Sequence, residues 1–358
     1  MDVPIVIDNG TYYVKVGFTN CELPTLVPCF LAKPFLHSFT NEKGQFKTLY
    51  GGEAISQHQT HSLSPISPSD EEEWGNLLEH IYNDILKTSS TKHPVLITEP
   101  PFQSQSNRQL ISQVLFERFE VPSICFASSP LLSLYATGSL NGLVVDVGHS
   151  SSSTVPVLEG QVFGDGIQQV SLGGQTVLKK FINLINTKLS TPLSNHRQCL
   201  LASQILHRVG YVASSSLSVP LACTYILPDG QSIVLERERT DPINVLFDPL
   251  SFRVDSFGIV DATLNTLNLC QTESRALLQK NIVITGGSSL FKGFAGRFVA
   301  ELKARLPSFA NIRVVNARDR HLLAFNGGRV LSSLACFGSM SVSRAEFEEN
   351  PLIDKVVG

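Results

Sequence analysis

The stretch PIVIDNGTYYVKVGF at residues 4–18 has a near-copy, GLVVDVGHSSSSTVPVLEG, at residues 142–160. Each copy reads as an apolar strand, then Asp-x-Gly, a short polar turn and a second strand of alternating apolar residues. A Gly two residues after an Asp at a hairpin tip lets backbone N–H groups approach an anion, while the Asp orients a metal-bound water. Two such hairpins indicate a duplicated α/β fold whose halves hold a nucleotide phosphate tail.

Composition narrows the class of protein and the partners to expect. A chain of 358 residues is long enough for two cores, and 42% hydrophobic with 16% charged residues is typical of a globular protein. The net charge of −3 gives no basic field, so we expect no direct nucleic-acid partner. No apolar run approaches the roughly 20 residues of a membrane helix, and the first strand begins too early to leave room for a signal peptide.

The seven cysteines are scattered and contain no CxxC pair. This spacing is typical of reduced thiols in a cytosolic or nuclear protein rather than of a zinc site or a disulfide framework.

Periodicity and turn signals predict the remaining elements in outline. Residues 74–86, 107–119, 130–138 and 259–269 are predicted helices, 93–101 and 124–127 are predicted strands, and 227–236 is a predicted hairpin through Pro-Asp-Gly. Residues 191–226 are predicted to be helical and then loop-like, and 281–294 to form a strand, a Gly-Gly turn and the start of a helix.

Six segments carry a resemblance to a known family. They are IDNGTYYVKVGF (7–18), HPVLITEPP (93–101) with NRQLISQVLFERF (107–119), VVDVGHSSSSTVPVLEG (144–160), LPDGQSIVLERER (227–239), VITGGSSLFKGF (283–294) and LAFNGGRVLSSLACFGSMSVSRAEF (323–347). In order, spacing and coverage they resemble the actin family. The resemblance implies the duplicated actin/Hsp70/sugar-kinase nucleotide-binding fold, with two large lobes that each carry a smaller subdomain.

The same resemblance implies approximate lobe boundaries. The first lobe would comprise residues 1–140 and 330–358, with a small inserted subdomain at about 30–70. The second would comprise residues 141–329, with a shortened small subdomain at about 180–250.

The resemblance also implies a site for ATP or ADP with Mg²⁺. The residues that match the family's nucleotide contacts are Asp8, Gly10, Thr11 and Lys15 in the first hairpin, Asp146 and Gly148 in the second, and Gly286, Gly287, Ser288 and Phe291 in the adenosine-side turn. Lys15 would offer a point charge to a phosphate, and Asp8 and Asp146 would hold Mg²⁺ through water. The alternative is that these residues only shape turns.

Departures from the family pattern bear on hydrolysis. Tyr12 replaces a Gly in the first hairpin, so we expect its side chain near the phosphates, and His149 replaces an Asp that holds a metal water. Ser153 and Ser129 replace the His and Gln that position the attacking water. Because in-line hydrolysis needs such groups, we expect ATP hydrolysis to be absent or very slow, and no catalytic residue is predicted. His149 is otherwise expected to be a polar surface residue.

Two further departures concern the base pocket and polymer contacts. Leu206 and His207 align where actins have a Lys and a Glu, which predicts a weakened adenine pocket. The loop tip TNEKGQ at residues 40–45 is polar where actin's is apolar, and residues 190–216 form a shortened region. Both features disfavour self-polymerisation, because they remove surface from one end of the subunit.

These observations favour a structural, weakly catalytic or non-catalytic subunit that binds nucleotide and caps or anchors a short actin-like filament. The run VLFERFEVPSICFASS (114–129) resembles the pointed-end actin-related subunit of dynactin, so actin-like filament subunits and dynactin-type members are the expected partners, in the cytoplasmic cytoskeleton. One alternative is a nuclear actin-related subunit of a chromatin-remodelling complex. A more distant one is an active ATPase on the same fold.

Overall fold

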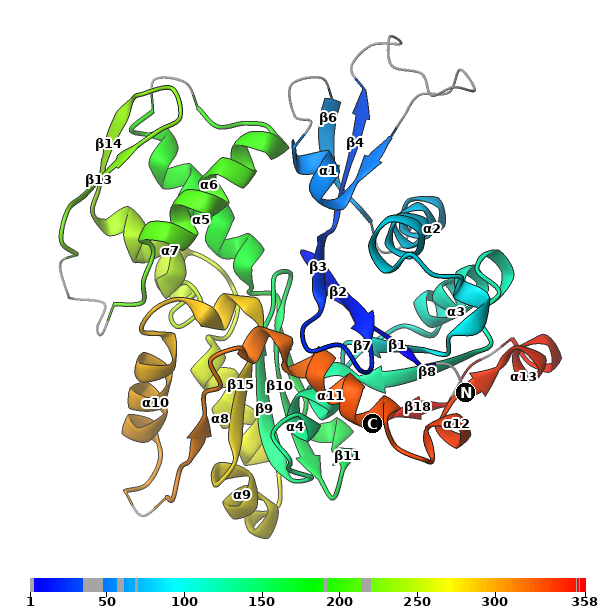
Figure 1. The fold of residues 1–358 in the computed structure, drawn as a ribbon. Coiled ribbons are helices and arrows are strands. Elements are labelled where there is room, and N and C mark those ends of the chain that lie inside the picture. The colour runs from blue at the N-terminus through cyan, green and yellow to red at the C-terminus, as the bar shows by residue number, and fades with distance from the viewer. Residues whose placement is uncertain are drawn as a thin grey trace. The chain divides into compact units, whose positions relative to one another are not determined.

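The structure, a computed structural model, describes residues 3–34, 48–56, 61–67, 70–189, 192–213, 220–308, 310–351, 353 and 355–358. The chain forms two compact units, drawn in Figure 1: unit 1 comprises Met1–Gly138 and Leu322–Gly358, and unit 2 comprises Ser139–His321. The sequence analysis predicted that the chain re-enters the first lobe at residue 330. The structure places this return at Leu322, because helix α11 (Leu323–Ser332) packs against the sheet of unit 1.

Unit 1 is built on a seven-stranded sheet with the order β17-β8-β7-β1-β2-β3, and β18 also pairs with β8. Strands β1 and β2 form an antiparallel hairpin, and β1, β7 and β8 run parallel. The strands are β1 (Ile5–Asn9), β2 (Tyr13–Phe18), β3 (Thr25–Pro28), β7 (Val95–Glu99), β8 (Ser123–Ser128), β17 (Val342–Ser343) and β18 (Val356–Val357).

Alternation along these strands divides the core of unit 1 between the two faces of the sheet. Val6 and Leu96 face one cluster, which includes residues of helices α4 (Ser129–Tyr135) and α11. Ile7 and Ile97 face the other cluster, under helices α2 (Glu71–His80) and α3 (Gln105–Gln113). Both helices continue as π-helical segments, Ile81–Leu86 and Val114–Arg118, so the predicted helices at 74–86 and 107–119 are confirmed in extent.

Two polar features anchor the helices of unit 1. Asp70 caps α2 by accepting a hydrogen bond of 2.9 Å from the N–H of Glu73, and the acidic residues of the first turn suit the helix dipole. The Arg108 guanidinium on α3 chelates the buried Glu99 carboxylate through bonds of 2.8 and 3.0 Å. Short helices α12 (Phe337–Met340) and α13 (Arg344–Glu349) complete the unit.

A small three-stranded sheet with the order β5-β4-β6 is inserted in unit 1. It consists of β4 (Phe30–Pro34), β5 (Leu49–Tyr50) and β6 (His61–Pro65), covered by helix α1 (Gly51–Ser56). The predicted polar loop tip at 40–45 lies outside the described residues.

Unit 2 repeats the topology of unit 1. Its six-stranded sheet has an antiparallel hairpin of β9 and β10, with β11 and β12 beyond β10, and β15 and β16 parallel to β9. The strands are β9 (Gly142–Val147), β10 (Ser152–Leu158), β11 (Gln161–Val162), β12 (Gln168–Val170), β15 (Ile282–Thr285) and β16 (Val314–Val315). The repeated order of hairpin and parallel strands confirms the predicted duplicated α/β fold.

One extended core fills unit 2, and its largest fully buried side chains include Phe181, Phe294 and Phe298. The helices are α5 (Gly174–Asn186), α6 (His196–Val209), α7 (Asp241–Asn244), α8 (Ile259–Leu269), α9 (Thr272–Gln279) and α10 (Phe294–Arg305). The Pro-Asp-Gly hairpin joins β13 (Cys223–Ile226) to β14 (Ser232–Leu235). Its first strand precedes residue 227, so the prediction of a loop through 226 is wrong there.

Candidate functional site

The first hairpin carries an ion pair near its tip, at the carboxyl end of strand β1. Asp8 on β1 and Lys15 on β2 are cross-strand partners, and the Lys15 Nζ lies 2.5 Å from Asp8 Oδ2. The Thr98 hydroxyl donates to Asp8 Oδ1 at 2.8 Å. Both charged side chains are largely buried, so the hairpin fixes their positions.

Gly10 and Thr11 form the tip of this hairpin. A Cβ added at Gly10 would lie 2.6 Å from the Tyr13 carbonyl oxygen, so the turn closes only around a glycine. Cys29, at the start of the small sheet, donates its N–H to the Tyr12 carbonyl at 3.0 Å and its thiol to the Gly10 carbonyl at 3.2 Å. Thr11 is exposed at the tip.

The Tyr12 ring packs edge-on against two aromatic rings, Phe30 of β4 with a centroid distance of 5.6 Å and Tyr13 at 4.9 Å. Sequence reasoning expected this side chain near the phosphates. The structure shows it in an aromatic cluster at the junction of the hairpin and the small sheet, where burying the ring against Phe30 is favourable, and its place near the phosphates stays a prediction.

The second hairpin brings several predicted residues together within unit 2. Asp146 on β9 lies opposite Ser153 on β10 and beside Thr285 on β15. The Gly148 carbonyl accepts hydrogen bonds from the Gly174 N–H at 3.0 Å and from the Ser288 hydroxyl at 2.7 Å.

The Gly-Gly turn after β15 lies directly against Asp146. Gly286 has φ of +89°, and an added Cβ would lie 2.4 Å from both Asp146 Oδ1 and the Val147 carbonyl oxygen. A Cβ at Gly287, by contrast, would meet nothing within 4 Å. Only glycine is compatible with position 286, and the next residue leaves open space beside the turn.

His149 is partly buried and is not the surface residue that the sequence predicted. Its Nδ1 would lie 3.1 Å from a Cβ added at Gly174, and its carbonyl accepts a bond of 2.8 Å from the Gln175 N–H. Burial, with the charges of His207 and Lys179 as smaller causes, lowers the pKa of the His149 imidazole to about 4. The imidazole is therefore neutral near pH 7.

The two residues aligned with the family's base-pocket Lys and Glu differ in placement. Leu206 is 2% exposed and belongs to the core of unit 2, so it presents nothing to a ligand. His207 is exposed on one part of its side chain, and its ring centroid lies 5.8 Å from that of the buried Phe291. Partial burial against this ring lowers the pKa of His207.

Ser129 and Ser153 occupy the positions at which the family pattern has the Gln and His that position the attacking water. Ser153 is 6% exposed within β10, and Ser129 begins helix α4, where its carbonyl accepts the Ser133 hydroxyl at 2.9 Å. Neither hydroxyl can act as a base near neutral pH.

Within the described ranges, no group of three or more His, Cys, Asp and Glu side chains gathers into a direct metal site. A single aspartate in a hairpin suits a cation held through water better than one enclosed by protein ligands. In the same part of the chain, no helix is long and apolar enough to span a membrane.

Comparison with known proteins decides the family. The family described as actin matches residues 2–198 and 203–355. The chain belongs to the actin family. It is also 31% identical over 372 aligned positions to "Putative actin-29" of Dictyostelium discoideum, with 96% of this chain and 94% of that protein covered.

Actin-family proteins generally bind ATP or ADP with a divalent cation, and each hairpin of this member carries groups of the kind that contact such a ligand. The first offers the Lys15 ammonium and the Asp8 carboxylate, and the second offers Asp146 beside the glycine turn. Sequence reasoning did not single out Thr98, although a polar residue near the end of an apolar strand is a detectable signal.

Proposed function

We propose that this actin-family chain binds ATP or ADP with Mg²⁺ and hydrolyses ATP slowly or not at all. The observation that carries the proposal is His149, a partly buried imidazole against Gly174 at the position where actins have a carboxylate that holds a metal water. Asp146 is the aspartate left in the second hairpin, and serines at positions 129 and 153 replace the Gln and His that position the attacking water in the family pattern.

In this proposal the residues of each hairpin bind rather than react. Lys15 donates to a phosphate oxygen while its bond to Asp8 fixes the ammonium, and Asp8 and Asp146 accept hydrogen bonds from waters around Mg²⁺. Bound Mg²⁺ supplies charge neutralisation of the phosphates. Gly286, Gly287 and Ser288 offer a close approach to the backbone for the α-phosphate or ribose, with Phe291 and His207 beside them.

We further propose that the chain is a structural subunit that caps or anchors one end of a short actin-like filament, as in a dynactin-type motor-adaptor complex in the cytoplasm. Three features support this role: the polar sequence at 40–45, the shortened region at 190–216 and the resemblance carried by residues 114–129. A subunit with one trimmed end cannot propagate head-to-tail contacts.

Nucleotide content tests the first proposal. Purified protein, denatured and analysed by HPLC, should release ATP or ADP near one per chain. A Lys15→Ala preparation should release much less, whereas Lys303→Ala, at an exposed position on α10, should match the wild type. Absence of nucleotide from wild-type protein, even after incubation with Mg-ATP, would contradict the proposal.

Filament assays test the second proposal separately. The isolated chain should stay in the supernatant on sedimentation in polymerising salt, and labelled protein should appear at one end of actin-like partner filaments. Self-assembled filaments, or decoration along filament sides, would refute the end-subunit role. Co-purification with chromatin-remodelling subunits instead of dynactin-type subunits would favour the nuclear alternative.

A further inference from the structure

A groove of about 280 Å³ lies in unit 2, and no residue of the β9–β10 hairpin lines it. Its lining comes from the loop after α7, from Asp261 on α8 and from one face of α10. Pockets for drug-sized ligands start at about 300 Å³, so this groove has room for one or two side chains rather than for a cofactor.

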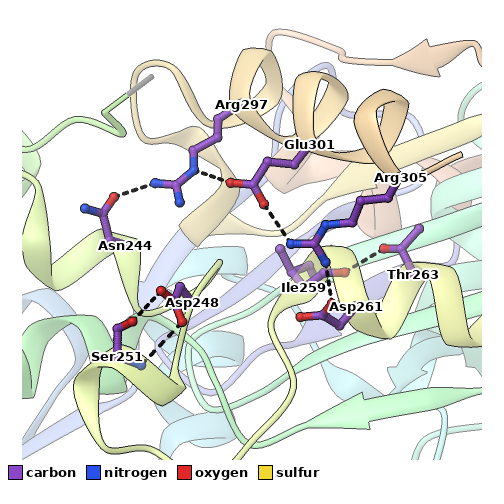
Figure 2. A network of polar contacts seen from close by, with 9 residues as sticks. All are labelled: Asn244, Asp248, Ser251, Ile259, Asp261, Thr263, Arg297, Glu301 and Arg305. Atoms are coloured by element: carbon purple, nitrogen blue, oxygen red, sulfur yellow. Dashed lines mark hydrogen bonds and ion pairs between the residues drawn. The ribbon is translucent and has the colours of Figure 1, made fainter. Parts of the chain in front are cut away.

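The floor of the groove is a fixed arginine. Arg297 is 7% exposed, and its guanidinium lies 4.4 Å from the centroid of the Phe247 ring. It donates to Asn244 Oδ1 and to Glu301 Oε1, each at 2.7 Å, as Figure 2 shows. A guanidinium held on three sides in this way makes the floor rigid.

A second arginine neutralises the carboxylates on one side of the groove. Arg305 pairs with Asp261, and its other nitrogen lies 3.6 Å from Glu301 Oε2 (Figure 2). Together, the two arginines balance the charges of Glu301 and Asp261.

The Asp248 carboxylate differs from those of Glu301 and Asp261 in its bonding partners. It accepts bonds from the Ser251 N–H at 3.3 Å and from the Ser251 hydroxyl at 2.5 Å, and among the described residues no Lys, Arg or His forms an ion pair with it. An exposed carboxylate without a cation is therefore presented at the groove.

Two large apolar side chains flank this carboxylate. Leu250 is 70% exposed and Phe257 is 60% exposed, and both line the groove. The 3₁₀ turn that carries Leu250 is tied to α5, because Lys180 Nζ donates to the Phe252 carbonyl at 2.9 Å. Exposed apolar groups around a charged centre on a fixed loop are typical of a protein-binding surface.

We propose that the groove binds a segment of a partner protein in which a lysine or arginine lies next to a large apolar residue. The cationic side chain would pair with Asp248 while the apolar one covers Leu250 and Phe257. A basic occupant is favoured over an acidic one because Asp248 carries the uncompensated charge, whereas both arginines of the groove are already paired. This inference concerns a different surface from the nucleotide site and does not depend on the end-subunit role.

A random twelve-residue peptide library on phage, panned against the full-length protein, tests the proposal. We expect enrichment of peptides that place Lys or Arg beside Leu, Ile, Phe or Trp. Binding of an enriched peptide, measured by fluorescence anisotropy, should weaken about tenfold or more in Asp248→Lys, because charge reversal turns attraction into repulsion. Leu250→Ser should also weaken it, and Asp165→Lys, a charge reversal at an exposed site outside the groove, should leave it unchanged.

Three results would overturn the proposal. The first is no enrichment of basic–apolar peptides, and the second is unchanged binding in both groove variants. The third is a concentration-dependent dimer in sedimentation velocity that Asp248→Lys dissociates, since the occupant would then be a second copy of this chain. Because both substituted side chains are exposed, melting temperatures near that of the wild type are expected, and the two variants check each other.

Discussion

Removal of the Lys15 ammonium should separate nucleotide binding from folding. In the absence of nucleotide, Lys15→Ala leaves the largely buried Asp8 carboxylate with the Thr98 hydroxyl and without its cation. Because this leaves a carboxylate buried without its cation, we expect the free energy of unfolding to fall by about 3 kcal/mol. The informative quantity is therefore the further stabilisation that ATP adds.

The size of that stabilisation follows from mass action. At a concentration of 100 Kd, ATP with Mg²⁺ should stabilise the wild type by about 2.7 kcal/mol. Loss of one charge-assisted phosphate contact, about 2 kcal/mol, raises Kd about 30-fold. At the same ATP concentration Lys15→Ala should then gain only about 0.9 kcal/mol.

Differential scanning calorimetry with and without Mg-ATP measures both gains. With about 2–4 °C per kcal/mol, the melting temperature should rise by roughly 5–11 °C in the wild type and by about 2–4 °C in Lys15→Ala. Lys303→Ala should behave as the wild type. Equal ATP-induced shifts in the wild type and Lys15→Ala would show that Lys15 does not contact phosphate.

Three further variants test other parts of the structure. Gly286→Ala should lower the free energy of unfolding by more than about 2 kcal/mol in urea titrations, because φ is +89° and Asp146 leaves no room, whereas Gly287→Ala should stay within about 0.5 kcal/mol of the wild type. Arg108→Ala, which leaves its carboxylate partner buried and uncompensated, should cost about 3 kcal/mol, against less than about 1 kcal/mol for Arg118→Ala in an exposed pair. The folded pKa of His149, about 4, lies below its unfolded value near 6.5, so its contribution to stability is complete above pH 6.5 and is lost as the pH falls toward 4. His149→Asn should flatten that part of the stability–pH curve, and an unchanged slope would contradict the burial of the imidazole.

The sequence predicted the repeated hairpins because a period-2 apolar pattern around Asp-x-Gly is a local signal. The same holds for the helix at 259–269, where the deciding residues are neighbours in the chain. The Gly-Gly turn was also visible, although its contact with Asp146 depends on the parallel pairing of β9 and β15.

Tertiary packing explains what the sequence did not reveal. The contact of the Tyr12 ring with Phe30 was not visible in the sequence, because the two residues are far apart in the chain. His149 looked like a turn residue at the surface, but the backbone at Gly174 lies close to its imidazole. The sequence did not predict strand β13, because the alternation of apolar and polar residues over 223–226 is too short to indicate a strand.

Single-turnover hydrolysis tests the central claim most directly. The purified chain is loaded with γ-³²P-ATP and Mg²⁺, and phosphate release is followed beside monomeric actin and beside a variant with the family's residues restored, Ser129→Gln, His149→Asp and Ser153→His. The account predicts that the wild-type chain releases phosphate no faster than monomeric actin and that the restored variant is faster than the wild type. Phosphate release by the wild type clearly above the rate of monomeric actin would contradict it.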